Sequence, residues 1–284
     1  MDQSASRELA GIAALAARSV GDRLREAFRS RPAVRTKRDF HDPVTEHDRA
    51  AEDIIRAVIA AECPDSVIVG EEGGVRRADG GEADAAEEGA VDGRVRWYVD
   101  PIDGTANFAA GVPFFCVSVA AAAGDEVVAG VVYDPMREEE FTAGPDGAFL
   151  GGRRLRSAGA ASDREAMLLT SYPSSRDLAV EGEAALGRFG RLVTSFAAVR
   201  RPGSAALKLA HVAAGWSDVA FGMGASPWDV AAGSLLVRRA GGVYIPLGGS
   251  VFRVGGYLAH VGGFDLAGSA LPEVARLRPA QISG

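Results

Sequence analysis

A short stretch near residue 100 places two acidic side chains where an apolar run meets a turn. It reads WYVDPIDGTAN from Trp97 to Asn107. A strand that ends at Asp100 fixes one carboxylate, and the bend at Pro101 brings Asp103 beside it. The same bend directs the carbonyl of Ile102 toward the two side chains. Hard divalent cations such as Mg²⁺ prefer oxygen ligands of these kinds, so the stretch predicts a cation site.

The residues that follow Asp103 indicate a second site beside the first. Gly104, Thr105 and Ala106 are small, and a helix that begins here would leave their backbone N–H groups without partners inside the helix. Such amides bind anions, because the positive end of the helix dipole adds to their hydrogen bonds. A metal ion and a phosphate group would then be neighbours.

The composition is that of a soluble globular protein. The chain has 284 residues, of which 47% are hydrophobic and 24% charged, so it can bury a large core. Its net charge of −7 argues against a role in coating nucleic acid, which usually shows as a basic face. The longest apolar run, residues 114–123, is too short to span a membrane, and the N-terminus has no signal-peptide pattern. We therefore expect a cytoplasmic protein that binds neither nucleic acid nor membrane.

The apolar pattern predicts a first half built on a large sheet with two covering helices. Apolar residues recur at helical spacing over residues 5–29 and again after Asp48. Strands are expected at 67–69, 97–100, 113–122, 126–134, 139–143 and 147–150. Glu71 and Glu72 follow the first strand as Asp100 follows the second, and ligand sites of α/β sheets gather at such strand ends. Residues 75–94 have little to bury, and we expect a surface insertion or loose hairpin without chemistry.

The second half is predicted to alternate between strands and helices. Strands are expected at 167–171, 192–199, 217–221 and 243–247, and helices at 178–189, 204–214 and 230–240. Local patterns also suggest structural roles for three polar residues. Asp48 follows Thr45 in an N-terminal capping pattern, and Asp229 precedes a helix as a cap. His211 lies on the apolar side of its helix, which indicates a core position.

Four separate stretches together resemble the inositol monophosphatase family of metal-dependent sugar and polyol phosphatases. They are Asp42–Asp48 with Lys37 ahead of it, Gly70–Glu72, Trp97–Phe108, and Trp228–Gly233 continuing to Gly242. One such match would be weak, but four in register are specific. The resemblance implies a mixed α/β fold, a five-layered α-β-α-β-α sandwich of the inositol monophosphatase and fructose-1,6-bisphosphatase type. It also implies an N-terminal α+β lobe over residues 1–155 and a C-terminal α/β lobe over residues 156–284.

The same resemblance implies roles for individual residues. The metal ligands would be the side chains of Glu71, Asp100, Asp103 and Asp229 and the carbonyl of Ile102, which would hold two or three Mg²⁺ ions, with Glu72 acting through water. The residues that carry the reaction would be Asp48, Glu71 and Thr105, because the Thr105 hydroxyl and Asp48 resemble the pair that orients the attacking water. Phosphate and substrate would be held by Asp103, Gly104, Thr105, Gly203, Ala205 and Asp229.

Electrostatics supports a metal site independently of the resemblance. Four carboxylates within a few ångströms repel by about 4 kcal/mol per pair at about 4 Å and an effective dielectric near 20, so without cations some would protonate or separate. Bound Mg²⁺ would remove that cost, lower the pKa of a bound water and stabilise the leaving alkoxide.

One position departs from the pattern of inositol-specific members, which carry a glutamate seven residues before the final motif aspartate. Here that position is Gly222, and the missing carboxylate weakens a preference for inositol without affecting the phosphate chemistry. We expect a Mg²⁺-dependent phosphomonoesterase for a small polyol or sugar monophosphate, with inositol 1-phosphate as the default. Alternatives are a histidinol-phosphate or 3′(2′),5′-bisphosphate nucleotide phosphatase, or a non-catalytic regulator that binds metal or phosphate. A homodimer is expected by resemblance.

Overall fold

The computed structural model describes residues 1–37, 43–81 and 93–282. Its helices are α1 (Gln3–Arg18), α2 (Gly21–Ala27), α3 (Glu46–Glu62), α4 (Thr105–Ala110), α5 (Ser175–Glu181), α6 (Glu183–Ser195), α7 (Ala205–Ala214), α8 (Pro227–Arg239), α9 (Leu271–Val274) and α10 (Pro279–Ile282). Over these residues, no helix combines the length and the apolar character that crossing a bilayer requires.

An eight-stranded sheet is built from residues 67–154. Its strands are β3 (Val67–Gly70), β4 (Gly74–Arg77), β5 (Val95–Asp103), β6 (Cys116–Ala123), β7 (Glu126–Asp134), β8 (Glu139–Gly144), β9 (Gly147–Leu150) and β10 (Arg153–Arg154). Their order is β10-β9-β8-β7-β6-β5-β3-β4. Strands β3 and β5 are parallel neighbours with Gly70 opposite Val99, so the residues that follow these positions, Glu71 and Asp100, reach the same edge of the sheet.

A five-stranded sheet forms the other half of the molecule. Its strands are β11 (Met167–Thr170), β12 (Ala198–Arg200), β13 (Val219–Ala225), β14 (Val243–Pro246) and β15 (Gly255–His260). The order is β12-β11-β13-β15-β14, and β11 is parallel to both of its neighbours. Two short strands, β1 (Arg35–Thr36) and β2 (Pro43–Val44), pair separately from both sheets.

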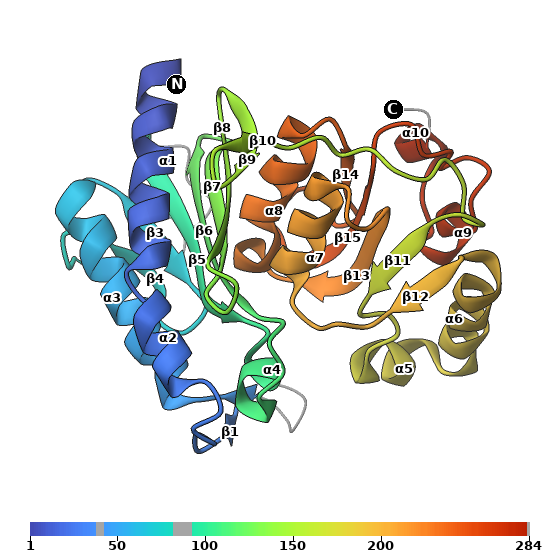
Figure 1. Ribbon diagram of the computed structural model, residues 1–284, viewed down its shortest axis with the longest axis horizontal. Helices are drawn as coiled ribbons and strands as arrows, with labels where there is room; N and C mark the ends of the chain where they lie inside the picture. Colours follow the sequence, from blue (N-terminus) through green and yellow to red (C-terminus); the bar gives the residue numbers. More distant parts are fainter. Residues whose placement is uncertain (38–42, 82–92, 283–284) are drawn as a thin grey trace.

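The helices and sheets stack in five layers (Figure 1). Helices α1, α2 and α3 cover one face of the large sheet, and α7 and α8 lie between the two sheets. Helices α5, α6 and α9 cover the outer face of the small sheet. Alternating apolar positions fill one core beneath α1–α3 and a second core around α7 and α8. The expected five-layered sandwich is therefore confirmed.

The N-terminal helix is shorter than its sequence pattern predicts. In place of one helix over residues 5–29, α1 ends at Arg18 and α2 begins at Gly21. Gly21 packs against the ring of Tyr133, where a Cβ would lie only 2.8 Å from the ring. The break lets the chain change direction and keep its apolar face on the sheet.

The strand expected over residues 192–199 is wrong. Helix α6 runs through Ser195, and only Ala198–Arg200 is a strand. Ala185 and Leu192 are both buried, and their spacing of two helical turns shows that the helical period continues through the aliphatic run. The expected helix over 178–189 is divided by Gly182, whose φ of 59° ends α5. Within the insertion expected at 75–94, β4 extends to Arg77 and pairs with β3, while residues 82–92 lie outside the described residues.

Candidate metal and phosphate site

Four acidic side chains from three separate segments meet at the carboxyl end of β5. The carboxyl groups of Glu71, which follows β3, and of Asp229, in the first turn of α8, lie close enough to Asp100 to shift its pKa. Asp103 lies close enough to Asp100 and Asp229 to repel both. A bulge interrupts the pairing of β5 with β6 between Asp100 and Asp103, and such bulges redirect side chains at functional sites.

The burial of this cluster makes its negative charge costly. The pKa of Asp100 is raised well above its ordinary value, first by burial and then by the charges of Glu71, Asp103 and Asp229. Burial followed by Asp103 and Glu71 raises the pKa of Asp229 in the same way. Without a cation, the cluster therefore retains protons at a pH where exposed carboxyl groups have lost them.

Asp103 connects the large sheet to helix α7. Its carboxylate accepts hydrogen bonds from the hydroxyl of Ser204 at 2.6 Å, the amide of Ala206 at 2.5 Å and the amide of Ala205 at 3.2 Å. These donors form the N-terminus of α7, where an anion is favoured. Burial raises the pKa of Asp103 although these hydrogen bonds oppose it. The amide of Ala205, expected at the substrate, is engaged by Asp103 in this arrangement.

Asp48 caps helix α3 and also contacts Thr105 at the candidate site. One of its oxygens accepts from the amide of Thr45 at 2.8 Å and from its hydroxyl at 2.6 Å, which completes the cap of α3. The other oxygen lies 2.9 Å from the hydroxyl of Thr105, which also lies 3.0 Å from the carbonyl of Ile102. The capping pattern in the sequence is therefore present, and the same buried carboxylate reaches the Thr105 expected from the resemblance.

The turn after β3 is held by a residue outside the predicted site. Glu52 is 1% exposed on α3, and its carboxylate accepts from the amides of Glu72 at 2.7 Å and Gly73 at 2.8 Å. Arg56 pairs with the same carboxylate at 2.7 Å. The signal in the sequence was an acidic residue on the apolar side of a helix, four residues before an arginine. Glu52 thereby fixes where Glu71 and Glu72 emerge from the sheet.

A second overlooked residue joins Asp229 to the large sheet. The prediction that Asp229 is the N-cap residue is wrong, because α8 begins at Pro227 and its N-cap residue is Ser226. Asp229 lies in the first turn of α8, where its carboxylate accepts from the amide of Ser226 at 2.7 Å and completes a capping box. Ser118, directly opposite Asp100 in the sheet, donates to the carbonyl of Trp228 at 2.9 Å. This bond ties the start of α8 to β6 and so brings Asp229 toward Asp100. The sequence signal was a single polar residue inside an apolar strand.

The predicted substrate loop is tied to the phosphate segment. Gly203 has a φ of 105°, and a Cβ there would lie 2.4 Å from the side-chain nitrogen of Asn107. That nitrogen donates to the carbonyls of Pro202 and Phe114, both at 2.7 Å. Gly104, which precedes α4 with a φ of 103°, also requires glycine. The amide segment after Gly104 and the loop at Gly203 are therefore held beside each other.

The donor set fits a hard divalent cation by its chemistry, because it consists of carboxylate and carbonyl oxygens. The side chains nevertheless contact protein donors instead of a common centre: across residues 1–37, 43–81 and 93–282, no three His, Cys, Asp or Glu side chains are arranged as a metal-binding group. Lys37 forms ion pairs with both Glu71 and Glu72. Burial lowers the pKa of Lys37, but the two carboxylates raise it by more, so the net effect is a raised pKa. A bound cation would have to replace such contacts.

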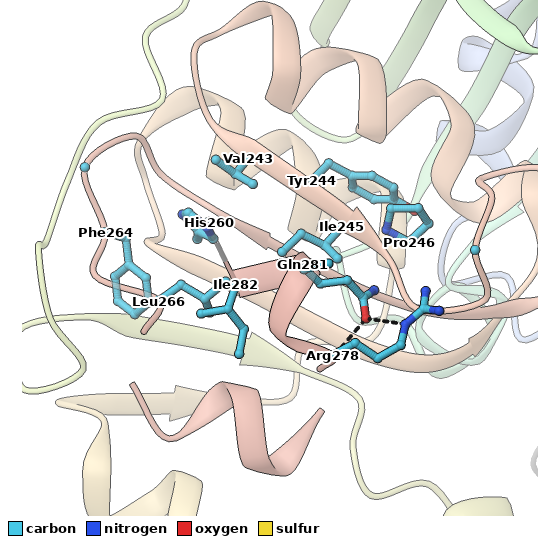
Figure 2. Close-up of a pocket in the computed structure, with 13 residues that line it drawn as sticks. Val243, Tyr244, Ile245, Pro246, His260, Phe264, Leu266, Arg278, Gln281 and Ile282 are labelled. Atoms are coloured by element: carbon cyan, nitrogen blue, oxygen red, sulfur yellow. Dashed lines mark hydrogen bonds between the residues drawn. The ribbon is translucent and has the colours of Figure 1, made fainter. Parts of the chain in front are cut away.

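A cavity of about 560 Å³ lies away from this cluster, between β14, β15 and the C-terminal segment (Figure 2). None of the described residues that line it is acidic. The two basic side chains that line it already have partners: a ring nitrogen of His260 lies 2.9 Å from the carbonyl of Val261, and Arg278 donates to Gln281 at 3.3 Å. The cavity therefore supplies none of the chemistry of the acidic cluster.

Several known proteins resemble this chain over most of its length. A profile described as the inositol monophosphatase family matches residues 5–279. Nus factor SuhB of Pseudomonas aeruginosa is 42% identical over 84% of this chain and 85% of its own length. The crystal structure of extragenic suppressor protein suhB from Bartonella henselae has a TM-score of 0.78 and 31% identity, covering 94% of this chain and 96% of its own.

An inositol monophosphatase II of Staphylococcus aureus, solved with inositol monophosphate bound, has a TM-score of 0.72 and 25% identity, covering 94% of this chain and 92% of its own. The family profile spans nearly the whole chain and all the segments that form the acidic cluster. The chain belongs to the inositol monophosphatase family.

Proposed function

We propose that this protein is a Mg²⁺-dependent phosphomonoesterase that hydrolyses a small polyol or sugar monophosphate. The observation that supports the proposal most strongly is the convergence of Glu71, Asp100, Asp103 and Asp229 beside the Asp48–Thr105 pair. Two or three Mg²⁺ ions bound there would activate water, hold the phosphate oxygens and stabilise the leaving alkoxide. Membership of a phosphatase family supports the same assignment.

Each part of the site has a proposed role in this reaction. Glu71, Asp100, Asp103, Asp229 and the carbonyl of Ile102 hold the ions, and Glu72 acts through water. The amides of Gly104 and Thr105 bind the phosphate, while Asp48 and the Thr105 hydroxyl orient the attacking water. The loop of Gly203 and Ala205 faces the alcohol part of the substrate, which also contacts Asp103 and Asp229.

Gly222 affects which substrate the site can recognise. A Cβ at this position would lie 2.9 Å from the ring of Tyr257, so the ring occupies the space into which a longer side chain would extend. An acidic acceptor for sugar hydroxyls is therefore sterically incompatible with this packing. Inositol 1-phosphate is the first substrate to test because the S. aureus relative was solved with inositol monophosphate, and histidinol phosphate and 3′(2′),5′-bisphosphate nucleotides follow.

Phosphate release across a panel of these esters tests the proposal. We expect release from at least one polyol or sugar monophosphate with Mg²⁺ and none with EDTA, measured as inorganic phosphate. The Asp100→Asn variant, purified in parallel, controls for a contaminating phosphatase. Absence of Mg²⁺-dependent release from every ester would contradict the proposal.

The raised pKa values predict that Mg²⁺ stabilises the protein more at higher pH. Folding raises the pKa values of Asp100 and Asp229, so the protonated carboxyl groups stabilise the folded protein. This contribution to the free energy of unfolding is complete below the unfolded pKa of about 3.9 and is lost as the pH rises toward the folded pKa values. Mg²⁺ compensates the deprotonated cluster, by about 2.7 kcal/mol at a hundred times its Kd. Thermal unfolding with and without Mg²⁺ should therefore show a larger Mg²⁺-induced increase in Tm at pH 7.5 than at pH 5. An increase of equal size at both would contradict the assignment.

A regulator that acts without turnover is a second candidate, favoured by the name Nus factor carried by the P. aeruginosa relative. This candidate predicts Mg²⁺-induced stabilisation without phosphate release from any ester. A regulator of this kind could contact nucleic acid as part of a complex. The expectation that this chain binds no nucleic acid therefore stays a prediction. The homodimer and the cytoplasmic location are also retained as predictions, and sedimentation of the purified protein would test the first.

A further inference from the structure

Lysine is used only at the acidic cluster in this chain. Of 31 basic residues, 29 are arginines and two are lysines, Lys37 and Lys208. Lys37 pairs with Glu71 and Glu72 at the open side of the cluster. Lys208 lies on α7, the helix whose N-terminus binds Asp103. The two compact ammonium groups therefore approach the same acidic cluster from different segments.

Lys208 is buried completely without a direct ion pair. It is 0% exposed, and its ammonium donates to the hydroxyl of Ser171. The ammonium also lies 5.8 Å from the centre of the ring of Tyr257. Among the described residues, Lys208 has no carboxylate within 4 Å of its ammonium group. Its near partners are therefore the neutral hydroxyl of Ser171 and the ring of Tyr257. A buried charge with only neutral neighbours is costly unless a surrounding field compensates it.

The field that compensates Lys208 comes from the acidic cluster. Asp103 and Asp229 are the opposite charges that act on it, and burial lowers its pKa to about 8 although these two carboxylates oppose the change. The charge of Lys208 in turn opposes the burial-driven rise in the pKa of Asp103. Lys208 is therefore mostly protonated at neutral pH, and its charge and that of the cluster depend on each other.

We propose that Lys208 is a built-in counter-ion of the acidic cluster, which holds the metal-free site together and reduces its affinity for Mg²⁺. The inference rests on the proposed Mg²⁺ site and adds a residue that sets the strength of binding there. A fixed positive charge near the carboxylates lowers the negative potential that attracts a cation, so a neutral residue in its place would bind Mg²⁺ more tightly. Such a device keeps the four carboxylates assembled before a cation arrives.

Calorimetric titration of Mg²⁺ into the wild type and two variants tests this proposal at pH 7. We expect Lys208→Met, which keeps an unbranched side chain one atom shorter and removes its charge, to bind Mg²⁺ roughly tenfold more tightly. Lys208→Arg, which keeps the charge, should retain the wild-type Kd within about threefold. The Mg²⁺-induced increase in Tm should likewise be larger for Lys208→Met than for Lys208→Arg. Arg188→Met is the matched control, because Arg188 is a partly buried cation that pairs with Glu181 away from the cluster.

The outcomes separate this inference from the proposed function. If the wild type binds Mg²⁺ and Lys208→Met binds it with the same Kd, Lys208 is only a packing residue and the inference fails while the proposed function stands. If the wild type binds no Mg²⁺, both fail. If Lys208→Met does not fold, the wild type labelled with ¹⁵N-lysine provides the test, because only two side-chain signals arise. The Lys208 signal should shift as Mg²⁺ saturates the site, and a signal that does not respond would overturn the proposal.

Discussion

Replacing Asp100 with asparagine is expected to lower kcat by about 10²- to 10³-fold, the loss that follows removal of one charge-stabilising group from an active site. The protein should still fold, because the retained side-chain oxygen can accept the hydrogen bond that Ile102 donates to Asp100 at 3.0 Å. Burial and its acidic neighbours already raise the pKa of Asp100 far above normal, so a neutral amide resembles the protonated side chain of the metal-free protein. The Tm without Mg²⁺ should therefore be unchanged or higher, while the Mg²⁺-induced increase is largely lost.

Asp134→Asn provides a matched control for this variant. Asp134, like Asp100, lies on a strand of the large sheet; it is 1% exposed and accepts a hydrogen bond from an amide two residues ahead, that of Met136, at 2.8 Å. Its charge is balanced by Arg137, so the substitution should lower stability and leave the response to Mg²⁺ intact. If Asp100→Asn has the same turnover and the same Mg²⁺-induced increase in Tm as the wild type, Asp100 is not a metal ligand.

The choice of Asp100 over Asp103 follows from the structure. Asp103 accepts from one hydroxyl and two amides at the start of α7, so an asparagine there would place its own N–H₂ group against one of these donors. Loss of activity in that variant would mix a lost charge with a disturbed helix. The local motif alone, in which Asp100 and Asp103 look equivalent, does not reveal this difference.

The arrangement of the first half could be predicted because its signals are local. The position of Glu71 and Asp100 follows from two apolar strands that each end in an acid, and only the parallel pairing of β3 with β5 had to be added to bring them together. The bend after Asp100 also places Asp103 beside it, whereas the layer order and the contribution of Asp229 follow from the family resemblance. Hydrophobic periodicity alone would not have joined Asp229 to a strand more than a hundred residues earlier.

What could not be predicted depends on contacts between distant segments. Ser118 reads as a polar interruption of a strand until the carbonyl of Trp228, 110 residues away, is seen to accept its hydrogen bond. Glu52 reads as an ordinary charged helix residue until the amides of Glu72 and Gly73 are seen to bind it. The aliphatic run at Leu192 predicts a strand as readily as a helix because its pattern is short, and tertiary packing selects the helix.

Replacing Thr105 with valine is expected to lower kcat by about 10²-fold with little change in KM or in the Kd for Mg²⁺, at the lower end of what positioned proton-transfer groups contribute. The Thr105 hydroxyl lies 2.9 Å from Asp48 and 3.0 Å from the carbonyl of Ile102, but it has a single proton to donate. When that proton goes to Asp48, the lone pairs of the hydroxyl can accept a hydrogen bond from water. Valine has nearly the same shape and removes this acceptor without removing a charge.

Thr105→Ser is the matched control, because it restores the hydroxyl and loses only a methyl group. We expect it to recover most of kcat, while Thr105→Val retains the Mg²⁺-induced increase in Tm that Asp100→Asn loses. This contrast separates orientation of the attacking water from metal binding: the two variants both lose turnover, but only one of them loses the ion. A Thr105→Val protein with wild-type kcat would show that the contact between Thr105 and Asp48 serves only to position α4 against α3, and the attacking water would then need a different partner.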